Sequence, residues 1–284
     1  MLPAFVLFLR EGLEASLIVS ILLASLHQLG QTHHARAVWT GVALAILGAA
    51  AGGSIIYFTV REYDDTIFQK AFETITYLVA VAVLTTVTFW MQRHSRSLKR
   101  EIAAQATAAG SGFALGLLAF TTVGREAVES AFFTLAFAFQ TNGMLLLLGA
   151  TLGILASVGL CILIYRMGYR LDYRLFFRVM GVLLLFFAAG LLGNAVQNMQ
   201  ELGWMRLGTT TLWDTSRLLS EENPVGDLLH GTLGYAQAPS ILQAIAYIGF
   251  LTIAGGLFWR ITRRTPLPQS SGATAPTGAS RQTA

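Results

Sequence analysis

The sequence is poor in charge and in cysteine, and each shortage excludes a class of protein. Only 12% of its 284 residues are charged, whereas 54% are hydrophobic; soluble domains carry about 25% charged residues. The single cysteine, Cys161, excludes a disulfide framework and a CxxC site. These shortages predict an all-α polytopic membrane protein.

Several catalytic and binding signatures are also missing. No GxxxxGK[ST] loop occurs, so the chain is not expected to hydrolyse nucleotides by itself. No Glu-x-x-His pair lies on a hydrophobic segment, which argues against a four-helix di-iron site. The net charge of +4 comes with basic residues in short loops, so it indicates membrane orientation and not nucleic-acid binding. No permanently bound cofactor is expected.

The sequence is instead rich in long hydrophobic segments, and each is close to the roughly 20 residues that are needed to cross a bilayer. Seven predicted spans cover residues 3–26, 38–60, 68–91, 112–140, 143–166, 175–198 and 240–260. The expected division is a three-helix repeat over 1–108, a second over 109–200, an outer loop with interfacial helices over 201–239, a seventh helix over 240–262, and a disordered cytoplasmic tail over 263–284.

The basic residues predict the orientation. Of the 19 Lys and Arg residues, thirteen lie in alternate loops and the tail on one side, four lie on the other, and two lie inside hydrophobic segments. Because cytoplasmic loops carry the excess of Lys and Arg, the N-terminus is predicted outside and the C-terminus in the cytoplasm.

The two basic residues inside hydrophobic segments belong to one repeated motif. Residues 10–14 read R-E-G-L-E, and residues 125–129 read R-E-A-V-E. Ionisable groups inside a bilayer are costly and mark ion or substrate paths. The copies lie three spans apart, and an odd number of spans reverses direction. Spans 1–3 and 4–6 are therefore predicted to be inverted repeats, which typically hold a substrate site near the midplane.

The chemistry of the motif predicts a cation site. Residues three or four apart share a helix face, so Glu11 and Glu14, like Glu126 and Glu129, project together. Four glutamates with Arg10 and Arg125 carry a formal −2, which protons or a cation would neutralise. Oxygen ligands favour hard cations such as Mg, Ca, Mn or oxidised iron. Structural salt bridges and proton relays are the alternatives, and the arginines are expected to organise the site.

Further acidic residues lie toward the outside. Glu73, about one turn inside the third span, is a candidate ligand or relay, or else the partner of Lys70 in an interfacial ion pair. The outer loop is acidic and is a candidate cation-attracting vestibule, unless it is merely solvated. Its vestibule candidates are Asp214, Glu221, Glu222 and Asp227.

The paired motifs resemble those of the oxidase-dependent iron transporter family, which includes fungal high-affinity iron permeases and bacterial EfeU-type permeases. The match covers Arg10, Glu11, Gly12 and Glu14, then Arg125, Glu126 and Glu129, with Ala127 in place of the second glycine. Residues 73–91 resemble the family's third span, and residues 213–216 and 228–231 resemble the bacterial branch. The resemblance covers about residues 1–260.

The resemblance implies seven spans, metal-binding roles for the motif glutamates, and iron uptake across the cytoplasmic (inner) membrane. Iron, as Fe²⁺ or Fe³⁺, would be the transported substrate, and periplasmic proteins that bind or oxidise iron would be partners. The alternatives are a permease for another hard or divalent cation such as lead or manganese, an intramembrane metal-dependent enzyme, and a proton-coupled carrier of an organic cation.

Overall fold

The structure is a computed structural model that describes residues 1–61, 66–94, 98–109, 111–140, 142–167, 173–215, 223, 226, 229–230 and 234–263. Within these residues the regular secondary structure is helical, and one isolated bridge joins Thr211 and Ser240. The elements, in chain order, are α1 (Leu2–Gln28), η1 (Thr32–His34), α2 (Ala35–Arg61), α3 (Ile67–His94), α4 (Leu98–Ala108), α5 (Gly112–Ala138), α6 (Gly143–Met167), α7 (Tyr173–Glu201) and α9 (Ile241–Arg263).

Five of these helical segments are long and apolar enough to cross a membrane: Thr32–Thr59, Ile67–Gln92, Gly143–Leu163, Leu175–Glu201 and Ile241–Thr262. The helices α1 and α5 are equally long, with 27 residues each, but each carries an arginine and two glutamates near its middle. These charges lower the apolar character of the two helices that the repeated motif occupies. The chain is therefore a membrane protein by composition and helix length.

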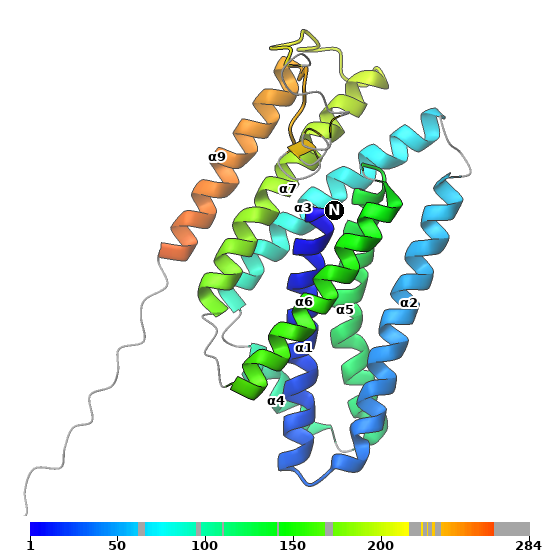
Figure 1. The fold of residues 1–284 in the computed structure, drawn as a ribbon, viewed down its shortest axis with the longest axis vertical. Helices are drawn as coiled ribbons and strands as arrows, with labels where there is room; N and C mark the ends of the chain where they lie inside the picture. Colours follow the sequence, from blue (N-terminus) through cyan, green and yellow to red (C-terminus); the bar gives the residue numbers. More distant parts are fainter. Residues whose placement is uncertain are drawn as a thin grey trace, which may run out of the picture.

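The helix α1 lies inside the bundle and contacts α6, α5 and α4 (Figure 1). The other main pairs are α2 with α5, α3 with α7, and α7 with α9. Figure 1 shows α1 and α5 running in opposite directions, because α1 ends and α5 begins at the lower end of the bundle. The two helices that carry the charged motif are thus antiparallel neighbours.

Both charged motifs lie between two separate apolar clusters. On α1, Leu7 belongs to one cluster and Ile18 to the other. On α5, Phe133 belongs to the first cluster and Val123 to the second. The motif residues occupy the interval between them on each helix, so apolar packing above and below holds the charged layer at a fixed depth.

Glycines permit the closest helix contacts. A Cβ on Gly153 of α6 would lie 2.6 Å from the carbonyl oxygen of Phe5 on α1. A Cβ on Gly116 of α5 would lie 2.9 Å from the carbonyl oxygen of Ala37 on α2. Such contacts are tighter than side chains normally allow, and small residues at membrane helix interfaces let backbones approach in this way.

One helix lies in a connection for which the sequence predicted no helix. The helix α4 falls in the connection between the third and fourth predicted spans, and its sequence L-K-R-E-I-A-A-Q-A-T-A is amphipathic. Ile102 and Ala106 are buried in the second apolar cluster, together with Leu22 and Leu26 of α1. The helix is too short to span a bilayer, which is why a search for long hydrophobic segments passes over it.

The connection between α7 and α9, predicted to lie outside, is described only in part. Its described ends are held together by hydrogen bonds, including Thr215 N to the Gln237 oxygen at 2.8 Å. Gly203, Gly208 and Gly234 have positive φ angles. Interfacial helices were predicted over 201–239, but the described residues 202–215 and 234–239 form turns and irregular structure. Within 216–233 only 223, 226, 229 and 230 are described. The tail was predicted over 263–284; Arg263 is the last residue of α9, and the rest lies outside the described residues.

Candidate metal site

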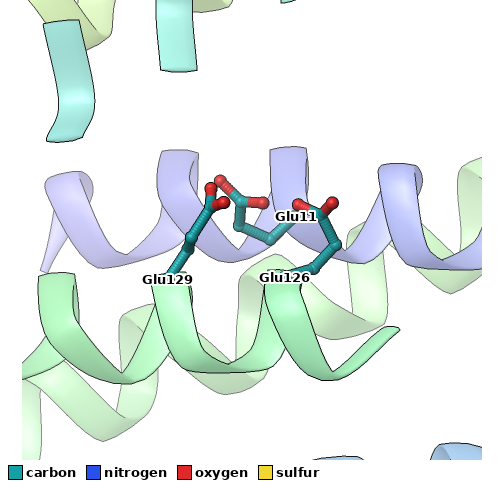
Figure 2. Close-up of side chains that lie close together, drawn as sticks. All are labelled: Glu11, Glu126 and Glu129. Atoms are coloured by element: carbon teal, nitrogen blue, oxygen red, sulfur yellow. The ribbon is translucent and has the colours of Figure 1, made fainter. Parts of the chain in front are cut away.

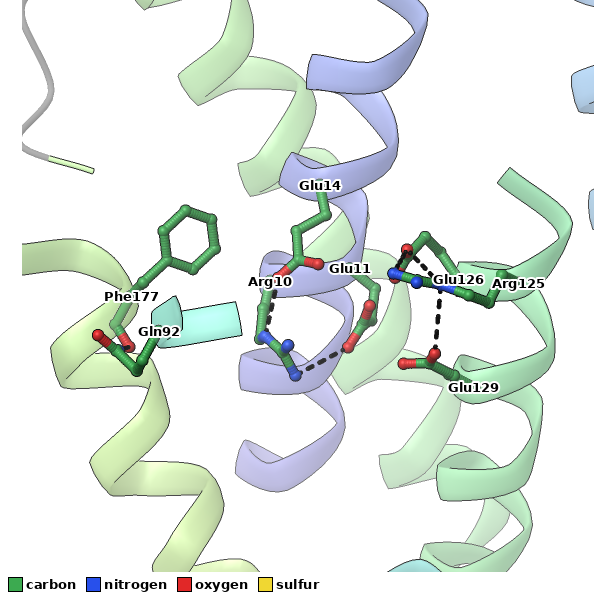
Figure 3. A network of polar contacts seen from close by, with 8 residues as sticks. All are labelled: Arg10, Glu11, Glu14, Gln92, Arg125, Glu126, Glu129 and Phe177. Carbon is green, nitrogen blue, oxygen red and sulfur yellow. Dashed lines mark hydrogen bonds and ion pairs between the residues drawn. The ribbon is translucent and has the colours of Figure 1, made fainter. Parts of the chain in front are cut away.

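The first copy of the motif forms a buried ion-pair network on α1 (Figure 3). Arg10 Nε lies 2.9 Å from Glu14 Oε1, and Arg10 Nη1 lies 3.2 Å from Glu11 Oε1. All three residues are only 2–3% exposed. The Arg10–Glu14 pair follows from the i,i+4 spacing, which brings side chains together on one helix face. Arg10 therefore stands between the two glutamates of its own motif.

The second copy repeats the pairing on α5 in a more open setting. Arg125 Nη2 lies 2.7 Å from Glu126 Oε1, and Arg125 Nε lies 3.6 Å from Glu129 Oε1. Glu126 is 3% exposed, but the side chain of Arg125 is 48% exposed and that of Glu129 is 16% exposed. The Arg125 guanidinium carbon lies 4.6 Å from the centre of the Trp90 ring on α3.

Three of the four motif glutamates converge between the two helices. Glu11 of α1 and Glu126 and Glu129 of α5 each offer a carboxylate oxygen within 4.8 Å of the others. Figure 2 shows their carboxylates directed into the space between α1 and α5. Because α1 and α5 are antiparallel, residues 115 positions apart in the sequence meet in one layer.

Each converging glutamate has one oxygen engaged and one oxygen unpartnered. The arginines engage Oε1 of Glu11, Glu126 and Glu129. The Oε2 atom of each is buried without a hydrogen-bond partner. A buried acceptor without a partner is strongly unfavourable, and a buried charge more so. A proton or a cation bound among these oxygens would remove that cost.

The charge and ligand type define which cation suits the site. Four ionised glutamates with two arginines leave −2, which a divalent cation balances. Carboxylate oxygens are hard ligands that suit Mg, Mn, Ca and iron, whereas soft metals prefer sulfur. No cysteine or histidine belongs to this group of three residues. The arrangement fits a site for a hard or borderline divalent cation.

The other predicted site residues that the structure describes are not members of this group of three. Glu14 pairs with Arg10 and is not a member of the converging three. Glu73 is half-buried near the start of α3, and Asp214 is exposed in the outer connection. Lys70, considered above as a partner for Glu73, lies 2.7 Å from Glu201 of α7. Glu221, Glu222 and Asp227 lie outside the described residues.

Two neighbours of the motifs were not identified as such from the sequence. Trp90 is in contact with Arg125, and Ser157 of α6 is packed against Gly12. Neither carries a charge or a motif, and an aromatic or small residue in an apolar helix is usual. Only the helix packing reveals their contacts with the charged layer.

The chain matches the iron permease FTR1 family over residues 1–264. It is 34% identical to the ferrous iron permease EfeU of Yersinia pestis over 270 residues, which cover 93% of this chain and 95% of that protein. The ferrous iron permeases EfeU of Shigella sonnei (strain Ss046) and Escherichia coli O157:H7 are each 34% identical over 280 residues, covering 97% of this chain and 99% of theirs. No solved structure matches the chain significantly. With its two antiparallel R-E-x-x-E helices and this match over nearly its whole length, the chain belongs to the iron permease FTR1 family.

Proposed function

We propose that this protein imports ferrous iron across the cytoplasmic membrane and that Glu11, Glu126 and Glu129 bind the ion in transit. The observation that carries the proposal is the convergence of three carboxylates, each with an unpartnered buried oxygen, between two antiparallel helices. Family membership and the printed name of the relatives support iron as the cargo, and their name supports the ferrous state. The −2 charge of the motifs suits Fe²⁺.

The proposed architecture has seven spans, with α1–α3 and α5–α7 as inverted repeats and α9 outside them. The packing supports this arrangement. If the two repeats exchange places, α1 takes the position of α5, α2 that of α6, and α3 that of α7. The α1–α6 pair then becomes the α5–α2 pair, and both pairs are major contacts. The α1–α5 and α3–α7 pairs are each converted into themselves. An approximate twofold relation between the repeats produces this pattern.

The repeats would comprise residues 1–108 and 109–200, followed by the outer loop 201–239, the seventh helix 240–262 and the tail 263–284. With the N-terminus outside, Glu11 lies nine residues from the outer start of α1, about 13 Å at 1.5 Å per residue. Glu126 lies twelve residues from the outer end of α5, about 18 Å. Both depths suit a site near the midplane of a membrane core about 30 Å thick.

The arginines and the remaining acidic residues take supporting roles in the proposed mechanism. Arg10 and Arg125 each hold one oxygen of the binding carboxylates, so the other oxygens face the ion. Glu14 holds Arg10 in place through their ion pair, and it would bind the ion only after leaving Arg10. Glu73 and the acidic outer loop would concentrate cations before they reach the site. An inside-negative potential contributes about 2.3 kcal/mol per charge per 100 mV to inward movement.

Periplasmic proteins that bind or oxidise iron are the proposed partners, on the basis of the family resemblance. They would deliver ions to the outer end of the bundle, where α7 ends and α9 begins. These partners are not needed for ion binding at the glutamates, so transport can be tested with the purified protein alone.

Uptake of Fe²⁺ into liposomes that contain the purified full-length protein tests the proposal. Glu126→Gln keeps the size of the side chain but removes the charge, and uptake should fall more than about tenfold, since even outer-shell changes at metal sites cost 10–100-fold. Glu101→Gln is the matched control, because Glu101 is an exposed glutamate of α4 outside both the site and the outer loop, and its uptake should remain close to wild type.

Competition by Mn²⁺ and Pb²⁺ in the same liposomes decides the cargo. Iron should be preferred over both. Faster transport of either competitor, with no uptake of iron, would assign the protein to another cation. Unchanged iron uptake by Glu126→Gln would remove the carboxylate site from the mechanism.

A further inference from the structure

We propose that Trp90 is a positioning residue for the metal site. Its indole ring holds the Arg125 guanidinium on one side of the α5 glutamates and so keeps their second oxygens free for the cation. The inference rests on the proposed function and adds to it a residue from α3, outside both charged motifs. It is carried by the contact of Trp90 with Arg125 together with the exposure of Arg125.

The contact is a cation–π interaction between two helices. The guanidinium carbon of Arg125 lies 4.6 Å from the centre of the Trp90 ring, within the roughly 6 Å over which such attraction acts. Trp is the strongest aromatic partner for a cation, and arginine is its commonest partner among the basic residues. The ring therefore provides a defined resting position for the Arg125 side chain.

Arg125 needs such a support because its surroundings do not enclose it. The side chain of Arg10 is 2% exposed, so close packing fixes the guanidinium of the first motif. The side chain of Arg125 is 48% exposed, although it holds the equivalent position in the second motif. An arginine side chain has considerable rotamer freedom when it is not packed. The Trp90 ring supplies at Arg125 part of the restraint that burial supplies at Arg10.

The position of the guanidinium determines which glutamate oxygens remain available. Arg125 Nη2 and Nε both lie close to Glu126 Oε1, at 2.7 and 3.2 Å, and Nε also approaches Glu129 Oε1 at 3.6 Å. The Oε2 atoms of both glutamates have no partner. A guanidinium has five N–H donors, enough to bind these oxygens as well. If the Arg125 guanidinium were released from the Trp90 ring, it would compete with the cation for the Oε2 atoms of the two glutamates.

The residue before Trp90 provides a matched control. Phe89 is also a partly buried aromatic residue of α3, but its ring packs against Phe258 of α9 at a centroid distance of 6.4 Å. Consecutive helix residues point about 100° apart, so the two rings serve different interfaces. A loss of general α3 packing should follow replacement of either ring, whereas a loss of Arg125 positioning should follow replacement of Trp90 alone.

The test is equilibrium binding of radioactive Fe²⁺, under anaerobic conditions, to the purified full-length protein, together with the concentration dependence of Fe²⁺ uptake into liposomes. Trp90→Leu removes the ring, Trp90→Met removes it with less change of shape, and Trp90→Phe keeps an aromatic face. The variants without the ring should raise the dissociation constant and the half-saturating concentration about three- to tenfold, with little change in the maximal rate. Trp90→Phe should fall between them and wild type, and Phe89→Leu should match wild type.

Three results would overturn the inference: wild-type affinity in Trp90→Leu and Trp90→Met, an equal loss in Phe89→Leu, or a loss in Trp90→Phe as large as in the variants without a ring. The proposed function is tested separately by the wild-type protein. If the wild type transports iron and the Trp90 variants keep its affinity, only the inference fails. If the wild type neither binds nor transports iron, the proposed function fails.

Discussion

The two copies of the R-E-x-x-E motif have nearly the same sequence and different surroundings. Arg10, Glu11 and Glu14 are all 3% exposed or less, whereas Arg125 is half exposed and Glu129 partly so. The difference follows from the positions of their helices, because α1 is covered by α6, α5 and α4. All three charged residues of the first copy are therefore enclosed, whereas in the second copy Glu126 is enclosed and Arg125 and Glu129 are more exposed. Internal repetition in the sequence does not produce equal environments.

The largest expected difference concerns the two arginines. Arg10→Gln leaves Glu11 and Glu14 buried without their cation, and breaking a buried ion pair in this way costs about 3–5 kcal/mol. Arg125→Gln should destabilise the protein less, because it removes the cation of one fully buried glutamate, Glu126, whereas Glu129 is partly exposed. Thermal unfolding of the two purified variants in detergent measures the contrast. Equal destabilisation would show that the difference in exposure has no energetic meaning.

Within the first copy, the two glutamates should differ in metal binding. Glu11 belongs to the converging group, whereas Glu14 is engaged with Arg10. We expect Glu11→Gln to weaken Fe²⁺ binding by about 100-fold, and Glu14→Gln to weaken it by about tenfold, in the range of changes next to metal ligands. Equilibrium binding of Fe²⁺ to the purified variants gives both values. The reverse ranking would move the site toward Glu14.

The middle residues of the motifs should also differ, although both are small. A Cβ on Gly12 would lie 2.9 Å from the Ser157 Cβ and nearer still to its hydroxyl. Gly12→Ala should therefore destabilise the protein by about 1–3 kcal/mol through overpacking. Ala127→Gly should cost about 1 kcal/mol or less, since it only lowers helix propensity.

A second substitution checks the reason for the Gly12 effect. Ser157→Gly removes the side chain that the new methyl group would meet, so the double variant should recover part of the stability lost in Gly12→Ala. Thermal unfolding of the single and double variants measures the recovery. No recovery would mean that the close contact between α1 and α6 at this point does not limit the size of residue 12.

The smallest effect is expected for the ion pair at the outer end of α3 and α7. Lys70 and Glu201 lie 2.7 Å apart but are 50% and 40% exposed. Exposed pairs contribute about 0–1 kcal/mol. Lys70→Gln should leave the unfolding temperature nearly unchanged. A loss of stability as large as that of Arg10→Gln would mean that the Lys70–Glu201 pair is enclosed in the membrane-inserted protein.

The sequence predicted the long helices well and the boundaries closely. The predicted spans 3–26 and 112–140 correspond to the helices α1 at Leu2–Gln28 and α5 at Gly112–Ala138, although neither helix is among the five that are apolar enough to count as candidate membrane spans. A long hydrophobic segment is a local property, so it is visible without an alignment. The amphipathic helix α4 was missed because its stability depends on burying Ile102 and Ala106 against α1, a contact between distant segments.

The site was predicted as a group of four converging glutamates, and the structure brings three of them together. The local spacing correctly indicated that Arg10 and Glu14 share a helix face. It did not indicate that Glu14, which is paired with Arg10, is not one of the three glutamates whose carboxylate oxygens converge. The choice depends on the rotation of α1 relative to α5, which follows from contacts with α6 and the other helices.

The sequence by itself determined that the chain is a helical membrane protein with two copies of one charged motif, because hydrophobic length, charge and spacing are local properties. Only the tertiary structure decided which carboxylates meet, which arginine is enclosed and that Trp90 lies over Arg125. The physical reason is that helices in a membrane are apolar on nearly all sides, so their hydrophobic pattern does not mark the packed face. That face is set by where small residues allow backbones to approach.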